Sequence, residues 1–274
     1  MALNFEQIRP YLIVFIITTF VVTIRYLLFA GSAYLVFWKK WKEKFSHRII
    51  QGKLADIAKI KTEIFYSLTT MLIFGMVGTG IFAAKKAGWT QIYDKLSDYS
   101  FAHFLFSIAA MILIHDAYFY ITHRLMHHKK IFKHVHLVHH LSTNPSPWAA
   151  FSFHPFEAVV EAGIVPLIIS FMPVHGLAIF IFLLYMTFLN VLGHLAFETF
   201  PKGFVRNGLT NWHNTTTHHN MHHKFFNCNY GLYFNWWDKL FKTNHKDYGI
   251  QFELITSQPL FLKSEKLVTR EQEI

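Results

Sequence analysis

Four stretches of the chain are apolar over a length that suits a membrane span. They cover residues 11–38, 64–84, 101–122 and 159–195. As a helix, the first stretch would reach roughly 42 Å, which exceeds the thickness of the hydrocarbon core of a bilayer. The fourth is too long for one span and is interrupted by Pro166 and Pro173, so we expect it to form the two helices of a hairpin. The pattern therefore predicts four or five membrane-embedded helices.

The polar segments divide the chain into three regions. Residues 1–100 hold the first two membrane helices and the loop between them, residues 101–245 hold the later helices and most of the histidines, and residues 246–274 form a polar tail. No apolar run after residue 195 is long enough to span. Because only helices and closed barrels cross a bilayer, we expect an all-α integral-membrane bundle, with a helical cap that carries the histidine-rich segments.

The composition supports a membrane protein and narrows its chemistry. Of 274 residues, 53% are hydrophobic and only 15% are charged, whereas about a quarter are charged in soluble domains. A net charge of +10 suits either nucleic acid or an anionic membrane surface, and the membrane explains it without a further assumption, so we expect no nucleic-acid partner. The single cysteine, Cys228, excludes a disulfide framework, a cysteine-based zinc site and a bound iron–sulfur cluster.

Lysine and arginine indicate the orientation of the chain. They number 21 on one side of the expected spans and 4 on the other. The side of a membrane protein that is rich in these residues is normally cytoplasmic. We therefore expect an N-terminus outside and a C-terminus and helical cap in the cytoplasm, in a multi-pass protein of the inner membrane or the endoplasmic reticulum.

Histidines recur at helical spacings on the expected cytoplasmic face. Of 19 histidines, 16 lie between His115 and His223. One H-x-x-x-H motif and two H-x-x-H-H motifs each place their imidazoles on one face of a helical turn. The members of these motifs are His123, His127, His136, His139, His140, His219, His222 and His223. Since all three motifs lie on the same side of the membrane, their side chains can meet.

Such a set of histidines favours a metal site over a structural role. A lone H-x-x-x-H pair is more often a surface or structural feature. Eight imidazoles brought together without a cation, however, would leave ring nitrogens unsatisfied or protonated rings repelling one another. One zinc needs three or four ligands, so eight histidines suit two ions. Imidazole ligands fit iron, copper, zinc or nickel, and no carboxylate lies inside the motifs.

Several neighbours of the motifs have more than one interpretation. Asp116 shares a helical stripe with His123, where it could accept an N–H from a ligand imidazole and fix its tautomer. Asp238 lies in an aromatic segment, and we expect it to order that segment rather than to take part in chemistry. Further histidines that remain open as an additional ligand are His154, His213 and His218. His154 could instead cap the start of the hairpin.

The three motifs, in this order on a membrane chain, resemble the fatty acid hydroxylase and sterol desaturase superfamily of integral-membrane di-iron enzymes. The similarity extends from about His115 to Thr243, through HDAYFYITHRLMH, NPSPWAAFSFHPFEA, GHLAFETFPKGF and NYGLYFNWWDKLF, and is closest to the sterol desaturase-like branch. It implies that residues 101–245 form a catalytic domain in which two irons are held by the eight histidines together with His194. The family often has glycine where this chain has Lys242.

The resemblance also implies an activity and its partners. Two irons with open positions would use dioxygen to hydroxylate or desaturate an unactivated C–H position of a lipid, and the residues leave these two outcomes open. The chain has no G-x-G-x-x-G motif, no P-loop and no cysteine set. Electrons must therefore come from a separate ferredoxin or cytochrome b5-type donor with its reductase, and a basic face suits an acidic donor. Sterol, isoprenoid, fatty acyl and alkylglycerol substrates all remain open.

Two other kinds of protein compete with an enzyme. A metal transporter or metal sensor without oxygen chemistry would place polar ligands near the middle of the bilayer. The motifs instead follow the ends of the expected spans and lie beside basic residues such as Lys129 and Lys130. A non-catalytic scaffold is disfavoured because every histidine of the three motifs is present.

Overall fold

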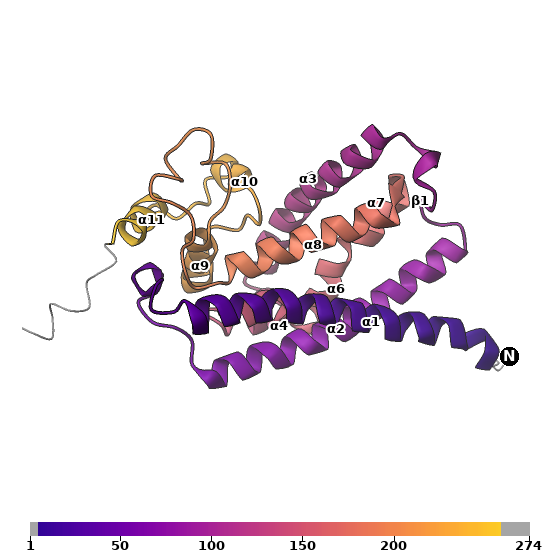
Figure 1. Cartoon of the computed structure of the whole chain (residues 1–274), viewed down its shortest axis with the longest axis horizontal. Helices are drawn as coiled ribbons and strands as arrows, with labels where there is room; N and C mark the ends of the chain where they lie inside the picture. Colours follow the sequence, from indigo (N-terminus) through magenta and orange to yellow (C-terminus); the bar gives the residue numbers. More distant parts are fainter. Residues whose placement is uncertain (1–4, 259–274) are drawn as a thin grey trace, which may run out of the picture.

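The computed structural model describes residues 5–258, which are mostly helical (Figure 1). Four helices are long and apolar enough to cross a membrane. They are α1 (Phe5–Ala33), continued by the π-helix η1 (Tyr34–Lys40), α2 (Ile57–Lys86), α3 (Phe101–Met126) and α8 (Gly176–Gly193). α1, α3 and α8 run along the long axis of the molecule toward the end that carries α9, and α2 runs in the opposite direction. The expected all-α membrane bundle is confirmed.

The fourth apolar stretch differs from the expected hairpin. Its first arm consists of two eight-residue helices, α6 (Pro155–Ala162) and α7 (Ile164–Phe171), which meet at Gly163. Pro166 does not break the arm, because it lies in the first turn of α7, where its missing N–H removes no helical hydrogen bond. Pro173 precedes a short strand, β2 (Val174–His175), which pairs in parallel with β1 (Ile92–Tyr93). Only the second arm, α8, is long enough to span.

Short helices form a cap at the end of the bundle opposite the N-terminus (Figure 1). The cap helices are α4 (Phe132–Val135), α5 (Leu137–His140), α9 (Thr216–Phe225), α10 (Trp236–Leu240) and α11 (Tyr248–Thr256). Three 3₁₀ turns complete the described helices: η2 (Ser46–Arg48), η3 (Leu96–Asp98) and η4 (Pro147–Phe151). α9 begins at Thr215, whose hydroxyl accepts the N–H of His218 at 3.3 Å and so caps the helix.

The region expected to be a polar tail begins inside the cap. Residues 248–256 form α11, and Phe252 is fully buried against Met221 of α9. The burial of this aromatic ring, which the polar composition of the segment conceals, ties the start of the tail to the cap. The rest of the tail, from residue 259, lies outside the described residues.

Hydrogen bonds tie the segments around the histidine motifs to the membrane helices. The hydroxyl groups of Tyr26 in α1 and Ser67 in α2 both donate to the carbonyl of Trp148, at 3.0 and 2.9 Å, and so hold η4 between the two helices. At the end of η1, the indole of Trp38 donates to the carbonyl of Leu195 at 2.9 Å. The residue before Leu195 is His194, so the end of the first span helps to fix a histidine of the site.

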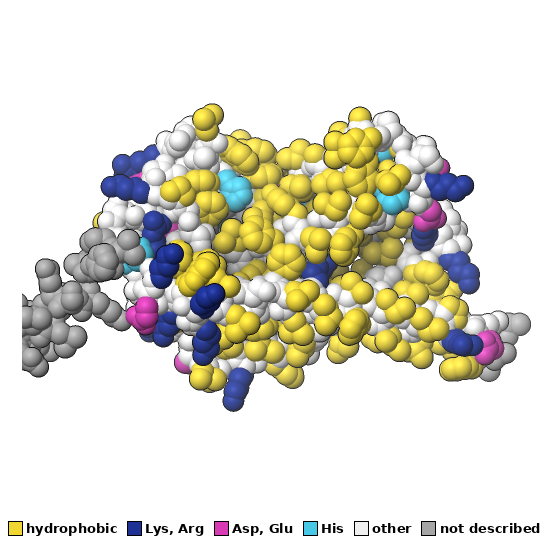
Figure 2. Space-filling model, in the orientation of Figure 1, with side chains coloured by type: hydrophobic (Ala, Val, Ile, Leu, Met, Phe, Trp, Pro, Cys, Tyr) yellow, Lys and Arg dark blue, Asp and Glu magenta, His cyan; other side chains and the backbone are white. Residues whose placement is uncertain are grey.

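The surface separates into an apolar middle and polar ends. Figure 2 shows hydrophobic side chains over most of the middle of the molecule, with Lys and Arg side chains gathered at the two ends and one basic patch within the apolar belt. Many large apolar side chains are more than half exposed, among them Ile16, Phe20 and Leu28 of α1. So large an apolar surface is unfavourable in water but is expected where the protein faces lipid.

The first two spans pack through glycine. Gly75 of α2 is buried, and a Cβ added to it would overlap the hydroxyl of Thr19 and lie 3.1 Å from the Cβ of Thr19 in α1. A small residue therefore lets the two backbones approach closely, which is a common basis of helix association in lipid. Gly80, one turn further along α2, is exposed and has nothing within 4 Å of the same position.

Gly75→Ala should destabilise the protein by about 1–3 kcal/mol, because the added methyl group forces α1 and α2 apart. Gly80→Ala is the matched control and should be neutral or slightly stabilising, since alanine is the better helix former. Thermal unfolding of the two variants in the same detergent measures the difference. Equal melting temperatures would contradict the close packing at Gly75.

Candidate metal centre

All nine histidines that the sequence singled out converge in the cap. Their ring nitrogens form two groups, and within each group the candidate ligand atoms all lie within 4.8 Å of one another. The first group is His123, His127, His136, His140 and His222, and the second is His139, His194, His219 and His223. All are buried except His127, which is half-buried. The number of groups equals the number of ions that the histidine count suggested.

The two H-x-x-H-H motifs each contribute to both groups. In the first motif, His136 and His140 belong to the five-histidine group and His139 to the four-histidine group. In the second motif, on α9, the assignment is reversed: His219 and His223 join the four-histidine group, and His222 joins the other. Helical spacing places the three rings of a motif on one face, but they do not all belong to the same group. Each motif links the two groups.

Backbone carbonyls fix the tautomers of three of these rings. The Nδ1–H of His123 donates to the carbonyl of Tyr230 at 2.8 Å, that of His194 to Asn190 at 2.7 Å, and that of His222 to Cys228 at 2.7 Å. A carbonyl oxygen can only accept, so Nδ1 carries the proton and Nε2 keeps its lone pair in the neutral ring. The free lone pairs of these rings point into the two groups.

The facing nitrogens are too close to be satisfied by one another. Nε2 of His123 lies 3.0 Å from Nε2 of His136, and the same atoms of His194 and His219 lie 3.1 Å apart. Two lone pairs at this distance repel unless a proton or a metal ion lies between them. Burial, reinforced by the neighbouring imidazoles, holds the pKa of His136 and His219 well below the ordinary value. Neutral, convergent nitrogen donors are the ligands that a transition-metal ion requires.

Glu157 is a member of the site that the sequence reasoning missed. It lies in the first turn of α6, is 1% exposed, and its Oε1 accepts the Nδ1–H of His136 at 2.7 Å. A carboxylate behind a metal-binding imidazole orients the ring and makes its other nitrogen a stronger donor. The sequence feature that could have indicated it is its position in FSFHPFEA, one helical turn after His154. It lies outside the histidine spacings.

The other candidate histidines lie outside both groups. The Nδ1 of His154 accepts the N–H of Phe156 at 3.3 Å and caps α6, which is the alternative role considered for it. His213 donates from Nδ1 to the carbonyl of Asn214 at 2.6 Å. His218 points away from the shared face, as expected, and its Nε2 lies 3.3 Å from Oδ2 of Asp238.

Asp116 contacts backbone rather than an imidazole. Its Oδ1 accepts the N–H groups of Tyr233 and Phe234 at 2.9 and 3.2 Å. The expected hydrogen bond to a ligand ring is not formed within residues 5–258, because the neighbouring backbone of the loop occupies that oxygen. Asp116 instead anchors the loop that carries Tyr230 to α3. It therefore affects the position of the His123 ring only indirectly, through that loop.

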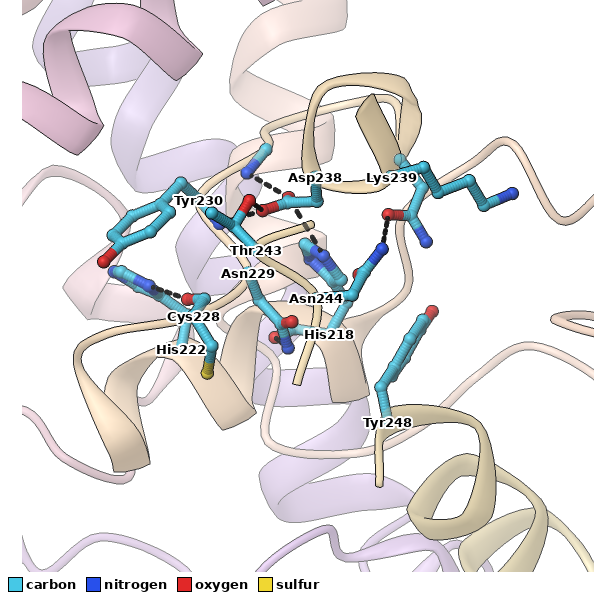
Figure 3. Close-up of polar contacts among 12 residues, drawn as sticks. His218, His222, Cys228, Asn229, Tyr230, Asp238, Lys239, Thr243, Asn244 and Tyr248 are labelled. Carbon is cyan, nitrogen blue, oxygen red and sulfur yellow. Dashed lines mark hydrogen bonds and ion pairs between the residues drawn. The ribbon is translucent and has the colours of Figure 1, made fainter. Parts of the chain in front are cut away.

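Asp238 organises the same loop from the other side (Figure 3). Its Oδ1 accepts the N–H of Tyr230 at 2.9 Å and the hydroxyl of Thr243 at 2.6 Å, and its Oδ2 accepts the N–H of Gly231 at 2.7 Å. Burial alone would raise the pKa of this carboxyl, but the contacts with His218, Thr243 and Gly231 outweigh it and lower the pKa to about 2. The expected ordering role of Asp238 thus has a physical basis.

The turn that contains Thr243 includes a residue in an unusual conformation. Lys242 has a φ of 55°, in the left-handed region that favours glycine. This is the position at which the superfamily that the sequence resembles often has glycine. The chain therefore forms the turn with a side chain that does not favour it, and the hydrogen bonds of Thr243 to Asp238 hold the turn in place.

Cys228 takes part in the site only through its backbone. Its carbonyl accepts from His222, whereas Figure 3 shows its sulfur directed away from that ring. Burial raises the pKa of the thiol to about 12, so the thiolate that would bind a metal is disfavoured.

An apolar cavity within the bundle adjoins both histidine groups. Its walls come from α1, α2, α3, α6, α7, α8 and η4. Phe119 and Phe153 line it, and their rings lie 4.8 Å from that of His123 and 5.3 Å from that of His139, measured between centroids. One wall of the cavity is therefore in contact with a ring of each group. A ligand held among the membrane helices would reach both groups from this side.

Asp238→Asn should destabilise the protein by about 2–3 kcal/mol, because the new amide presents a donor to N–H groups that require an acceptor. Bound metal should fall as well, since Tyr230 loses its fixed position beside His123. Asp247→Asn is the control, because the side chain of Asp247 makes no cap for α11.

The ionised Asp238 also makes stability depend on pH. Its stabilisation is complete above the ordinary pKa of 3.8 and is lost as the pH falls through about 2. Wild-type melting temperature and metal content in Asp238→Asn would contradict the ordering role.

Comparisons with known proteins identify the family. The family model described as fatty acid hydroxylase matches residues 108–243. The Delta(7)-sterol 5(6)-desaturase ERG3B of Gibberella zeae is 32% identical over 188 residues, which are 66% of this chain and 54% of that protein. The lathosterol oxidase of Homo sapiens is 25% identical over 201 residues, 72% of this chain and 64% of that protein.

A longer match is found with the Delta(7)-sterol 5(6)-desaturase erg3C of Aspergillus fumigatus, which is 26% identical over 248 residues, 85% of this chain and 75% of that protein. The chain thus spans little more than half the length of the Gibberella relative and three quarters of the Aspergillus relative. No solved structure matches. The family model covers all three histidine motifs and His194. The chain belongs to the fatty acid hydroxylase and sterol desaturase superfamily, in its sterol desaturase-like branch.

Proposed function

We propose that the chain is a membrane-bound di-iron oxidoreductase that uses dioxygen and external electrons to hydroxylate or desaturate a C–H position of a lipid. The observation that carries this proposal is the pairing of two convergent histidine groups with an apolar cavity. The named activities of the relatives support it, since all three reported above are sterol-oxidising enzymes by name.

The two groups fit one iron each. His123, His127, His136, His140 and His222 would hold the first, and His139, His194, His219 and His223 the second. Two irons bound there would supply the reduction of dioxygen and the oxidising power to attack an unactivated C–H bond. Both groups consist of nitrogen donors alone, which is compatible with iron but also with zinc or copper.

The residues of the chain itself position the substrate and keep the site dry. Phe119 and Phe153 separate the cavity from His123 and His139, and their rings would hold a hydrocarbon against the groups. With metal bound, an ionised Glu157 behind His136 would offset part of the positive charge of the ions. A lipid enters such a cavity from the bilayer, so a sterol, another isoprenoid or a fatty acyl chain is the expected class of substrate.

Electrons would reach the site from the cytoplasmic side. His127 is the one half-buried member of the two groups, and the exposed Lys129 and Lys130 follow it after one intervening residue. A basic surface beside the most accessible ligand suits an acidic protein such as a ferredoxin or a cytochrome b5-type donor served by its reductase. The same basic side supports the proposal that the cap faces the cytoplasm.

A metal transporter or sensor is the alternative function, and the position of the site disfavours it. Both groups lie at the ends of α3 and α8 rather than in the middle of the spans, since His123 is on the last turn of α3 and His194 directly follows α8. Transport sites usually lie near the bilayer midplane on interrupted helices. A conduction path would also have to pass the large apolar side chains that line the cavity.

Protein purified in detergent and reconstituted anaerobically with Fe²⁺ should bind about two irons per chain and convert a member of a lipid panel only when dioxygen and reductant are present. Anaerobic reconstitution is needed because Zn²⁺ binds such sites more tightly than Fe²⁺. Metal analysis and mass spectrometry of the lipids provide the measurements. One tightly bound iron per chain would refute the di-iron assignment, and two irons with no lipid oxidation would favour the sensor.

His139→Ala and His222→Ala should each abolish turnover and lower the metal content, because they remove a ligand from the four-histidine and the five-histidine group, respectively. His175→Ala and His245→Ala should do neither, since these rings cap backbone N–H groups. Cys228→Ser should also retain metal and activity, because only the carbonyl of Cys228 contacts the site. Loss of iron in Cys228→Ser with iron retained in His222→Ala would replace this model by one with a thiolate ligand.

A further inference from the structure

A single charged residue lies in the middle of the first span. Arg25 is the one Asp, Glu, Lys or Arg between residues 10 and 38, and it is 8% exposed. A guanidinium keeps its proton in proteins. Ionisable residues inside membrane spans are costly and usually serve a function. Arg25 therefore requires a partner that offsets its charge.

That partner is not found among residues 5–258. Arg25 forms no ion pair, and its Nε is buried without a hydrogen bond. Its side chain instead lines the apolar cavity, together with Val22 and Thr18 of the same helix. Glu161 lines the cavity as well but makes no ion pair with Arg25. A buried cation that faces an apolar cavity is the arrangement expected of an anchor for an anionic ligand.

The cavity is large enough for such a ligand. Its volume is about 170 Å³, whereas roughly 10–15 Å³ is enough for one water. Apart from Arg25, His115, Glu161 and Asn190, its walls are almost entirely hydrocarbon or aromatic. The site thus offers one fixed positive charge and a long apolar surface, which together match an amphiphile with a negatively charged head group.

We propose that Arg25 binds the anionic head group of the lipid in this cavity, so that the preferred ligand is an acidic amphiphile, with a carboxylate or a phosphate, rather than a neutral sterol. The hydroxyl group of a sterol could accept a hydrogen bond from Arg25 but would leave its charge uncompensated. A carboxylate or phosphate accepts two parallel N–H bonds from a guanidinium and cancels the charge. The proposal rests on the proposed function in taking the cavity as the substrate site.

The position of Arg25 along α1 would place the head group at the end of the cavity nearer to the histidines. Of the three residues of α1 that line the cavity, Thr18, Val22 and Arg25, the last is nearest to the end of the span where Trp38 bonds to Leu195. Thr18 lies about 10 Å further from that end, at 1.5 Å per residue, where Gly78 also lines the cavity. The tail of the ligand would extend toward Thr18 and Gly78.

Binding of palmitate, hexadecyl phosphate and hexadecanol to the iron-loaded, anaerobic protein in neutral detergent tests the proposal, because the three probes share one chain length and differ in head group. The wild type should bind palmitate or hexadecyl phosphate at least tenfold more tightly than hexadecanol in a scintillation proximity assay with radiolabelled probes. Whichever anion binds more tightly distinguishes a carboxylate from a phosphate ligand. Equal affinities for the alcohol and both anions would overturn the proposal, even without any variant.

Arg25→Gln should weaken binding of the preferred anion roughly 10- to 100-fold and leave hexadecanol unchanged, whereas Arg25→Lys should retain the preference for an anion. Lys40→Gln removes an exposed positive charge at the end of the same span and should change nothing. Glu161→Gln should retain or strengthen anion binding. If Glu161→Gln and Arg25→Gln instead lost it equally, the two side chains would form an internal charge pair and the anchor would be refuted.

Iron content confirms that each variant is folded. Since no turnover occurs without dioxygen, these affinities do not depend on the proposed activity. A failure of lipid oxidation and a failure of anion binding would therefore be separate results.

Discussion

The structure depends on one electrostatic constraint: imidazole nitrogens whose lone pairs point at one another require a proton or a metal ion between them. Nε2 atoms about 3 Å apart, as between His140 and His222, are repulsive in the neutral state. Burial at the same time disfavours the protonated rings, and it lowers the pKa of His194 to about 4. In the proposed function, two metal ions would supply the positive charge that this arrangement of lone pairs favours. Metal binding and folding of the cap should be closely coupled.

Several segments outside the two groups hold the imidazole rings in this arrangement. The loop from Cys228 to Gly231 provides carbonyls for His222 and His123, and Asp238 and Asp116 fix the loop through its N–H groups and those that follow. Asp116 and Asp238 thus influence the rings indirectly, through the backbone that they hold. Glu157 is the exception, because it contacts His136 directly. Backbone acceptors orient rings without adding negative charge to the site.

Sequence periodicity predicted the spans and eight of the histidines because both depend on local spacing, whereas His194 was implied by the resemblance to the family. The hydrophobic runs gave α1, α2, α3 and α8, and the helical repeats gave the motifs. What it missed depends on tertiary contacts. Gly163 rather than Pro166 divides α6 from α7, since a proline in a first turn is harmless. Spacing within H-x-x-H-H could not show that His139 and His136 belong to different groups, because this follows from where α9 packs.

The position of the site at the end of the bundle would reconcile two different requirements of the proposed function. In the proposed function, a lipid would approach through hydrocarbon, and the cavity brings Phe119 and Phe153 against one side of the groups. Electrons would come from a water-soluble or surface-bound donor, and the half-buried His127 lies two residues before the exposed Lys129 on the other side. A site in the middle of the spans would satisfy the first need alone, and one on a soluble domain only the second. Histidines on the last turn of α3 and just past α8 lie at the one depth where both approaches meet.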